Sequence, residues 1–254
     1  MKLPENAFKR ALREGRPQIG LWVGLANAYV SELLASTGFD WLALDGEHSP
    51  NDPRTVLQQL QAIAPYPTHA VVRTLSDDAS LMKQYLDIGA QTVLVPMVET
   101  AEQAARIVSS TRYPPGGVRG VGSALARASR WNQVENYLHS CEQELCVLVQ
   151  VETTRGIQNL RAIADTPGVD GVFFGPSDLA ASMGLLGRSG DPSVRTAVEE
   201  GIRVVMGAGK AAGVLTVDSA AARRYLDVGA RFVAVGLDTA LLVQSARKLA
   251  SDFR

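Results

Sequence analysis

The segment Trp41-Leu42-Ala43-Leu44-Asp45-Gly46-Glu47-His48 is an apolar run that ends in an acid, a glycine, a second acid and an imidazole. Its boundaries, Gly38 before and Gly46 after, are typical of a buried strand between turns. His48 is the only one of the three histidines that directly follows such a strand. Asp45 is near enough in sequence to orient this imidazole or to tune its charge. We therefore expect the chemistry to begin where this strand ends.

Strands and helices alternate on both sides of this segment. Apolar runs predict strands at residues 18–24, 41–45, 69–74, 91–96, 146–151, 171–175, 214–217 and 231–235. Helical periodicity and capping residues predict helices at 4–16, 28–36, 53–64, 77–86, 101–111, 132–141, 156–164, 191–209, 219–226 and 239–252. Strands that alternate with helices in this number predict a single-domain α/β fold over residues 1–254, a (β/α)8 TIM barrel.

An internal repeat supports the barrel. The hexapeptides Tyr85-Leu86-Asp87-Ile88-Gly89-Ala90 and Tyr225-Leu226-Asp227-Val228-Gly229-Ala230 are nearly identical, and each places a glycine after a predicted helix and before an apolar strand. The competing architecture is a doubly wound open sheet. No Gly-x-Gly-x-x-Gly stands at a strand-to-helix turn, where a dinucleotide would need it, so the strand count favours the barrel.

The composition narrows the classes of function. The 25 basic and 26 acidic residues nearly balance and no Lys/Arg run occurs, which argues against nucleic acid or a membrane surface as a partner. Cys141 and Cys146 match neither a C-x-x-C redox pair nor a structural zinc site, and we expect no disulfide. The N-terminal residues lack the apolar core of a signal peptide, and no apolar run approaches the roughly 18 residues of a membrane span. We expect a reducing, cytoplasmic location.

One loop is unusually long. Pro114-Pro115-Gly116-Gly117-Val118-Arg119-Gly120-Val121-Gly122 leads into a polar, arginine-bearing excursion as far as Asn132. Loops of this length in a compact domain are more often functional than idle. It is either a flap over a site or a surface connection, and its glycines permit the backbone to approach an anion closely.

In a TIM barrel the active site lies at the carboxyl ends of the strands. The polar or exposed candidates there are Asp45, Glu47, His48, Arg73, Pro96, Met97, Gln150, Glu152, Ser177 and Asp178. Glu152 and Asp178 end strands that are adjacent in sequence order, so their carboxylates can approach one point, as an oxygen-ligated divalent cation requires. The alternative is that Arg155 or Arg73 neutralises them.

The histidines and Arg73 also have structural alternatives. His48 is either a catalytic imidazole or a hydrogen-bonded histidine at a strand end, while His69 and His139 are expected to be structural. Arg73 ends an apolar strand and must be paired, because a buried unpaired guanidinium is costly. Its partner is a substrate carboxylate, a developing enolate or a structural acid.

The lysines exclude one kind of chemistry. Schiff-base aldolases need a desolvated lysine that reaches the substrate from a barrel strand. None of the lysines here lies on a predicted strand. Carbonyl chemistry at this site would therefore need a metal.

The strand-end motifs together resemble those of a known family. The matching stretches are Asp45-Gly46-Glu47-His48, Val72-Arg73, Tyr85 to Met97, Pro114 to Gly122, Gln150-Val151-Glu152-Thr153 and Gly175-Pro176-Ser177-Asp178-Leu179. They span essentially the whole chain, which resembles the HpcH/HpaI aldolases, the metal-dependent class II pyruvate aldolases. Within that family it is most similar to 4-hydroxy-2-oxoheptanedioate aldolases and to 2-dehydro-3-deoxyglucarate aldolases.

The resemblance implies a role for each matching residue. His48 would be the general base, Arg73 would stabilise a pyruvate enolate, and Glu152 and Asp178 would bind a divalent metal cation, Mg²⁺, Mn²⁺ or Co²⁺. Gln150 and the backbone around Ser177 and Asp178 would hold the substrate. The family often has alanine where this chain has Ser177.

The family also uses an aspartate that corresponds to Asp87 to raise the basicity of the histidine. The prediction from the residues alone places Asp87 near a helix end, which makes Asp45 the nearer candidate. A contact across a subunit boundary would reconcile the two.

By the same resemblance the reaction is a reversible retro-aldol cleavage that belongs to aromatic-compound catabolism. The substrate would be 4-hydroxy-2-oxoheptanedioate, and the products pyruvate and succinate semialdehyde. Alternatives are a 2-dehydro-3-deoxyglucarate-type aldolase that yields tartronate semialdehyde, a related acyl-CoA lyase, and a catalytically silent barrel that binds a 2-oxo acid. No basic cluster for the phosphates of CoA is apparent, and no expected base or metal ligand is missing.

The resemblance further implies a homohexamer, a dimer of trimers. The apolar helix predicted around residues 241–249 would pack either on a neighbouring subunit or on its own barrel.

Overall fold

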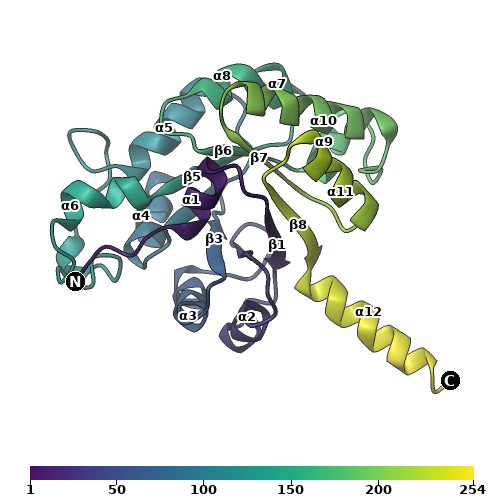
Figure 1. Ribbon diagram of the computed structural model, residues 1–254, viewed down its shortest axis with the longest axis horizontal. Coiled ribbons are helices and arrows are strands. Elements are labelled where there is room, and N and C mark those ends of the chain that lie inside the picture. The colour runs from purple at the N-terminus through teal and green to yellow at the C-terminus, as the bar shows by residue number, and fades with distance from the viewer.

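The computed structural model describes residues 1–254, and its eight strands close into a parallel barrel in sequence order, with β8 paired to β1 (Figure 1). The strands are β1 (Gln18–Val23), β2 (Trp41–Asp45), β3 (His69–Arg73), β4 (Thr92–Val95), β5 (Cys146–Val151), β6 (Gly171–Phe174), β7 (Ala211–Leu215) and β8 (Phe232–Leu237). The predicted (β/α)8 barrel is confirmed, and the doubly wound sheet is wrong.

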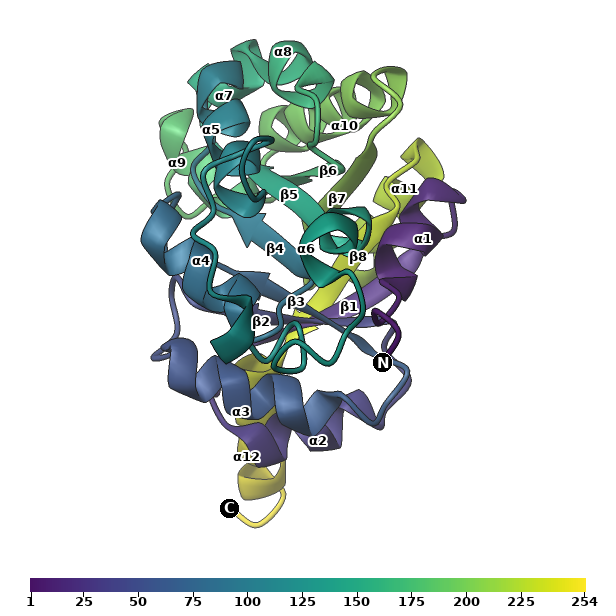
Figure 2. The same ribbon diagram turned by 90° about the vertical axis from the view of Figure 1, so that its left-hand side faces the viewer.

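Helices surround the strands, as the turned view makes plain (Figure 2). They are α1 (Ala7–Arg13), α2 (Ala28–Ala35), α3 (Pro53–Ile63), α4 (Ala79–Asp87), α5 (Ala101–Thr111), α6 (Tyr137–Ser140), α7 (Thr154–Gln158), α8 (Leu160–Asp165), α9 (Pro176–Ser182), α10 (Pro192–Gly207), α11 (Ser219–Val228) and α12 (Asp238–Ser251). Short 3-10 turns occupy Ser123–Leu125 and Cys141–Glu144.

Three predicted elements differ from the structure. The helix expected at 132–141 shrinks to α6, because Arg130, Trp131, Asn132 and Asn136 all have positive φ, which a continuing α-helix does not allow. The helix expected at 156–164 is two helices, α7 and α8, which meet at Asn159. Strand β7 covers 211–215 instead of 214–217.

Aromatic rings fill the barrel interior, so the barrel is a packed core and not a pore. Trp41, Phe173 and Phe232 lie with ring centroids 5.7–6.5 Å apart. Gly20 and Gly213 make room for them: a Cβ on Gly20 would lie 2.2 Å from the Trp41 ring, and one on Gly213 would lie 2.3 Å from the Phe232 ring. The glycines of β1 and β7 therefore leave the space that the aromatic rings of β2 and β8 occupy.

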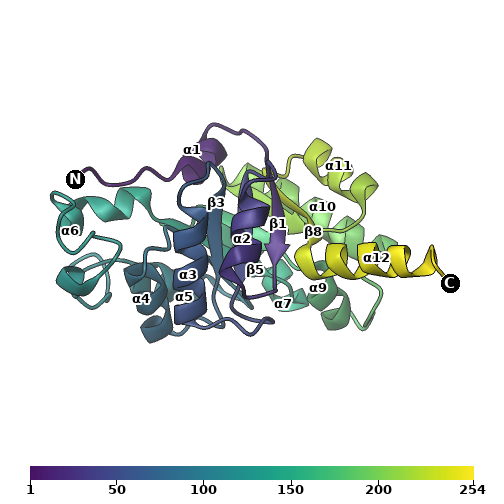
Figure 3. The same cartoon turned by 90° about the horizontal axis from the view of Figure 1, so that it is seen from below.

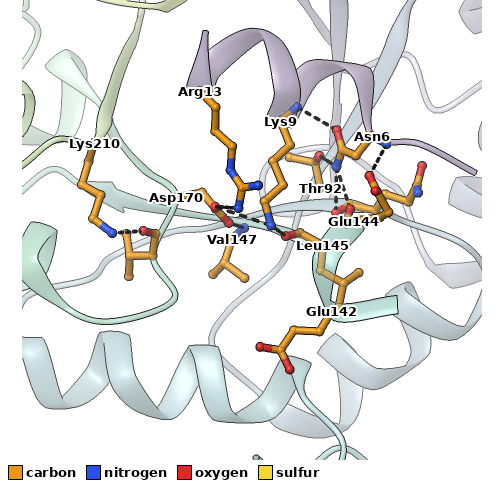
Figure 4. A network of polar contacts seen from close by, with 12 residues as sticks. Asn6, Lys9, Arg13, Thr92, Glu142, Glu144, Leu145, Val147, Asp170 and Lys210 are labelled. Atoms are coloured by element: carbon orange, nitrogen blue, oxygen red, sulfur yellow. Dashed lines mark hydrogen bonds and ion pairs between the residues drawn. The ribbon is translucent and has the colours of Figure 1, made fainter. Parts of the chain in front are cut away.

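Helix α1 closes the amino end of the barrel (Figure 4). The Asn6 side-chain amide donates to Thr92 Oγ1 at 3.0 Å and to the Glu144 carbonyl at 3.0 Å, and the buried Lys9 ammonium donates to the Leu145 carbonyl. Lys9 Nζ also lies 3.6 Å from Asp170 Oδ1. Because these partners begin β4 or directly precede β5 and β6, the helix ties together the start of three strands.

Helix α12 leaves the barrel instead of covering it (Figures 1 and 3). Asp238 anchors its first turn by accepting the backbone N–H groups of Gly24 at 2.9 Å and Leu25 at 3.0 Å. Beyond that turn its apolar side chains stay in solvent, with Leu242 59% and Leu249 62% exposed. The helix does not pack on its own barrel.

No helix of the chain combines the length and the apolar character that a membrane span needs.

His69 makes the folded protein sensitive to acid. It starts β3 half-buried, with its ring stacked on Phe8 at 5.5 Å and Nε2 2.8 Å from Thr92 Oγ1. Burial lowers the pKa of His69 from 6.5 to about 4. The unfolded chain therefore takes up a proton below pH 6.5 while the folded chain stays neutral, so stability that is present above pH 6.5 is lost as the pH falls towards 4.

We predict that wild type loses about 1–3 kcal/mol of unfolding free energy relative to His69→Gln between pH 7 and pH 4. Urea unfolding of both proteins across this range measures the difference, and the titration of groups common to both cancels in it. A difference in unfolding free energy between the two proteins that stays constant from pH 7 to pH 4 would contradict the prediction.

Candidate active site

A cavity of about 520 Å³ opens at the carboxyl ends of the strands. The predicted site residues that line it are Asp45, His48, Arg73, Gln150, Ser177 and Asp178. Asp45 on β2 and Asp178 on α9 are 133 positions apart in the chain, and the barrel closure brings β2, β3, β5 and α9 to one mouth. The rule that chemistry gathers at this face of a TIM barrel thus selects side chains that the structure brings to one cavity.

Arg73 and Asp45 form the fixed centre of the cavity. They are register partners on β3 and β2. Arg73 Nε donates to Asp45 Oδ1 at 2.9 Å and Nη2 to Oδ2 at 2.7 Å, and Nη1 lies 2.6 Å from Glu47 Oε2. The guanidinium also lies over the Trp22 ring at 4.8 Å. The structural ion pair considered for Arg73 is therefore present, and Arg73 still faces the cavity.

This pairing decides the charge of Asp45. Burial raises the pKa of Asp45, but the hydrogen bonds and positive charge of Arg73 outweigh burial and hold that pKa below its usual value. Burial raises the pKa of Glu47 above its usual value despite the nearby Arg73. Asp45 is thus the anion that locks the arginine in place.

His48 lies at the cavity edge with an open ring. Its side chain is 65% exposed, and the nearest carboxylate is Glu47, with Oε1 3.9 Å from Nε2. Asp45 Oδ1 accepts the backbone N–H of Glu47 at 2.9 Å and that of His48 at 3.3 Å. In this chain Asp45 therefore shapes the turn that carries His48, and its carboxylate binds the backbone and not the imidazole.

Glu152 is buried beside Gln150 and carries an unusual pKa. Met97 donates its backbone N–H to Glu152 Oε1 at 3.0 Å, and the Gln150 side-chain amide donates to Oε2. Burial raises the pKa of Glu152 to about 7, with a further contribution from the negative charges of Asp178 and Glu47. A cation that enters the site would therefore stabilise the ionised form of Glu152.

Asp178 approaches from α9, a helix that the sequence analysis did not predict. Pro176 starts this helix directly after β6, which places Ser177 and Asp178 in its exposed first turn. An acidic residue in the first turn is favoured by the partial positive charge of the helix N-terminus. The Gly-Pro-Ser-Asp sequence marks a turn, and Pro at the first helical position is the signal that would have identified the helix.

The residues present fit a divalent cation. No arginine or lysine lies within 4.0 Å of Glu152 or Asp178, because Arg155 pairs with Glu99 at 3.3 Å and Arg73 with Asp45 and Glu47. The neutralisation considered from the sequence is thus absent. Gly175 leaves open the space at Glu152, where a Cβ would lie 2.2 Å from Oε2. Gln150 Oε1 is buried without a hydrogen-bond partner. Carboxylates without a cationic partner and an amide oxygen without a hydrogen-bond donor are ligands that Mg²⁺ and Mn²⁺ prefer.

The structure does not bring Asp87 to His48 within one chain. Asp87 ends α4, does not line the cavity, and accepts a hydrogen bond from Arg119 Nη2 at 2.7 Å. Arg119 is fully buried and lies over the Tyr113 ring at 4.5 Å. Residues 114–132 are likewise absent from the cavity lining, so this excursion packs beside α4 in the protomer and forms no flap over the site.

Some cavity residues were not found from the sequence. Arg195 on α10 and Tyr225 on α11 line the cavity, together with Thr216 and Asp218 after β7. Side chains of helices do not follow the strand-end rule. Tyr225 lies in the repeated hexapeptide, but the repeat gives no indication that it faces the cavity.

Comparison with known proteins agrees with this geometry. Residues 18–245 match the family model for HpcH/HpaI aldolase/citrate lyase. The chain is 63% identical over 254 residues to a hydroxypyruvate/pyruvate aldolase of Paraburkholderia phytofirmans (strain DSM 17436 / LMG 22146 / PsJN), covering 100% of this chain and 95% of that protein.

A second relative, the 4-hydroxy-2-oxo-heptane-1,7-dioate aldolase of Salmonella heidelberg (strain SL476), is 58% identical over 249 residues, covering 98% of this chain and 95% of that protein. The crystal structure of an HpcH/HpaI aldolase/citrate lyase family protein from Burkholderia cenocepacia J2315 superposes with a TM-score of 0.94 at 41% identity, covering 98% of this chain and 99% of that one. The chain belongs to the HpcH/HpaI aldolase/citrate lyase family, and it is an enzyme of the lyase class, an aldolase.

Proposed function

We propose that the protein reversibly cleaves a 4-hydroxy-2-oxo acid, 4-hydroxy-2-oxoheptanedioate, to pyruvate and succinate semialdehyde in a reaction that depends on a divalent metal cation. One observation carries this proposal. Asp178 lines the same cavity as a fixed arginine, Arg73, and an open imidazole, His48, and Glu152 is buried directly beside the cavity residue Gln150. Neither carboxylate has a cationic partner in the chain. The whole chain, residues 1–254, would act as one domain.

Glu152 and Asp178 would hold the cation. When bound, it supplies Lewis-acid polarisation of the 2-oxo group and stabilises the negative charge that develops on the enolate oxygen. Gln150, whose Oε1 has no partner, and the backbone around Ser177 and Asp178 would hold the carboxylate end of the substrate. Mg²⁺, Mn²⁺ and Co²⁺ are the candidate ions.

His48 would remove the proton from the C4 hydroxyl as the C3–C4 bond breaks. Its ring is accessible and no hydrogen bond occupies it, as a base that must reach a substrate requires. Arg73 faces the charge that develops on the pyruvate fragment, and its fixed pairing with Asp45 spares the cost of reorienting it during the reaction. Asp87 would assist His48 only across a subunit boundary, since it is remote within the protomer.

A second enolate donor, hydroxypyruvate, should be tested beside pyruvate. The relatives named hydroxypyruvate/pyruvate aldolase suggest that hydroxypyruvate can replace pyruvate as the enolate donor. Condensation of either donor with succinate semialdehyde, followed by separation of the products, compares the two directly.

We predict that dialysis against EDTA lowers the rate of pyruvate release from 4-hydroxy-2-oxoheptanedioate by about 100-fold or more, and that Mn²⁺, Mg²⁺ or Co²⁺ restores it. Lactate dehydrogenase coupling measures the pyruvate, and added pyruvate in the same buffer checks the coupling enzyme. Full activity after exhaustive metal removal would contradict the metal dependence.

We predict that His48→Ala lowers kcat by about 10²–10⁴-fold, as expected for a lost general base. Arg73→Ala should lower kcat by about 10²–10³-fold through lost electrostatic stabilisation. His139→Ala is the matched control, since this exposed histidine lies outside the cavity, and it should retain wild-type activity. Because Arg73 bridges buried acids, Arg73→Lys and a melting curve separate misfolding from lost chemistry. Wild-type turnover by His48→Ala would exclude the assigned base.

The exposed apolar face of α12 supports a homo-oligomer, and the family resemblance suggests a hexamer, a dimer of trimers. We predict a mass near six protomers of 27.1 kDa for wild type by light scattering coupled to size exclusion. The double variant Leu242→Asp, Leu249→Asp should have a lower mass, because the buried contact of α12 with a neighbour is lost. Gln244→Asp adds one acidic charge to the same helix without removing an apolar side chain and should leave the mass unchanged. A monomeric wild type would rule this assembly out.

A further inference from the structure

One cation in the cavity wall has no ionic partner. Among the arginines and lysines that line the cavity, Arg73 is bound to Asp45 and Glu47, whereas Arg195 on α10 has no carboxylate oxygen within 4.0 Å. An arginine presents a planar fork of donors that matches a carboxylate. Arg195 is therefore the one guanidinium at this mouth that is available to an anionic ligand.

The acids nearest to Arg195 along its helix are engaged elsewhere. Glu199, one turn later, accepts hydrogen bonds from Arg224 at 2.5 and 3.1 Å. Asp191, one turn earlier, accepts the hydroxyl of Ser193 at 2.7 Å and its backbone N–H at 3.0 Å. These pairings explain why a surface arginine with acids at both i−4 and i+4 still lacks an ion pair.

One acid faces Arg195 from the cavity itself. Asp218 lines the same cavity, but its carboxylate caps α11 by accepting the backbone N–H of Ala220 at 2.8 Å, and it forms no ion pair with Arg195. The charge of Arg195 therefore remains open to a ligand.

Arg195 lies on the far side of the barrel mouth from the proposed enolate site. Arg73 ends β3, while α10 leads into β7, and the closed order of eight strands places β3 and β7 opposite each other. The β7 and β8 side of the cavity adds the apolar residues Leu215, Val217 and Leu237. A ligand that spans the mouth thus meets catalytic polar groups, an apolar wall suited to methylenes, and a guanidinium.

We propose that Arg195 binds the distal carboxylate of the substrate, so that the cavity selects 4-hydroxy-2-oxo acids that carry a second carboxylate beyond a short methylene chain. This assignment rests on the proposed aldolase function and adds to it a residue that determines specificity. The distal carboxylate is unchanged during the cleavage, so Arg195 should act mainly on binding of the substrate.

The test compares two substrates of equal length in wild type and Arg195→Gln. One is 4-hydroxy-2-oxoheptanedioate, and the other is 4-hydroxy-2-oxoheptanoate, which has a methyl group in place of the distal carboxylate. The rate of pyruvate release gives kcat and KM for each combination of enzyme and substrate. Arg203→Gln is the matched control, because Arg203 is an exposed arginine of the same helix that does not line the cavity.

We expect Arg195→Gln to lower kcat/KM for the dicarboxylate by about 10- to 100-fold, mostly through KM, because a charge-assisted hydrogen bond is lost. The value for the monocarboxylate should change by about twofold or less, since that substrate has nothing for the arginine to bind. Arg195→Lys should restore part of the preference, and Arg203→Gln should behave as wild type. This pattern would support the assignment.

Other outcomes overturn it in distinguishable ways. If Arg195→Gln leaves the preference for the dicarboxylate intact, or lowers kcat/KM equally for both substrates, Arg195 is not the carboxylate receptor, although the aldolase function stands. If wild type releases no pyruvate from either substrate with metal present, the proposed function itself fails and the assignment of Arg195 fails with it.

Discussion

The two-point hydrogen bond between Arg73 and Asp45 is the interaction on which the active-site mouth depends. It joins the ends of β2 and β3 in register, and it fixes a guanidinium over Trp22 at the top of the aromatic core. Asp45 Oδ1, which accepts the hydrogen bond of Arg73 Nε, also accepts the backbone N–H groups of Glu47 and His48 and so shapes the turn that presents His48. Removal of Arg73 would leave the buried charge of Asp45 without compensation, which costs several kcal/mol. The fold thus uses one ion pair both to close the strand ends and to position the reactive groups.

The acidic side of the cavity, around Glu152, differs from the Arg73 side because its charge is not balanced by a cation of the chain. Glu152 is buried close to Asp178 and Glu47, and no cation of the chain balances it. Burial without a partner is unfavourable for a carboxylate, and a protein tolerates it where a ligand supplies the missing charge. The cavity therefore combines a side that is already neutralised, around Arg73, with a side that is not, around Glu152. For the proposed substrate, this asymmetry would favour one orientation of its charged groups in the cavity.

The sequence predicted the barrel and many of the polar side chains that the structure brings to the cavity, because both follow from local patterns. Apolar runs bounded by glycine located strands such as 41–45 and 146–151, and the strand-end rule then collected His48, Arg73 and Glu152. The rule could not find Arg195, because its position depends on how α10 packs beside the mouth. It also suggested that Asp45 contacts the imidazole, although the pleat directs that carboxylate towards Arg73. The helix expected at 132–141 failed because its backbone adopts positive φ at several ordinary residues, which no periodicity reveals.

The position of α1 has a consequence for how the chain reaches its native state during synthesis. The helix leaves the ribosome long before its partners: the Lys9 to Leu145 hydrogen bond spans 136 residues, and Asp170 is later still. Until β4 to β6 have been made, Phe8 and the Lys9 stem have no barrel to cover. Contacts of such separation form late, because the entropy of closing the intervening chain must be overcome first. Helix α1 is thus made well before its partners and is among the last elements to be ordered.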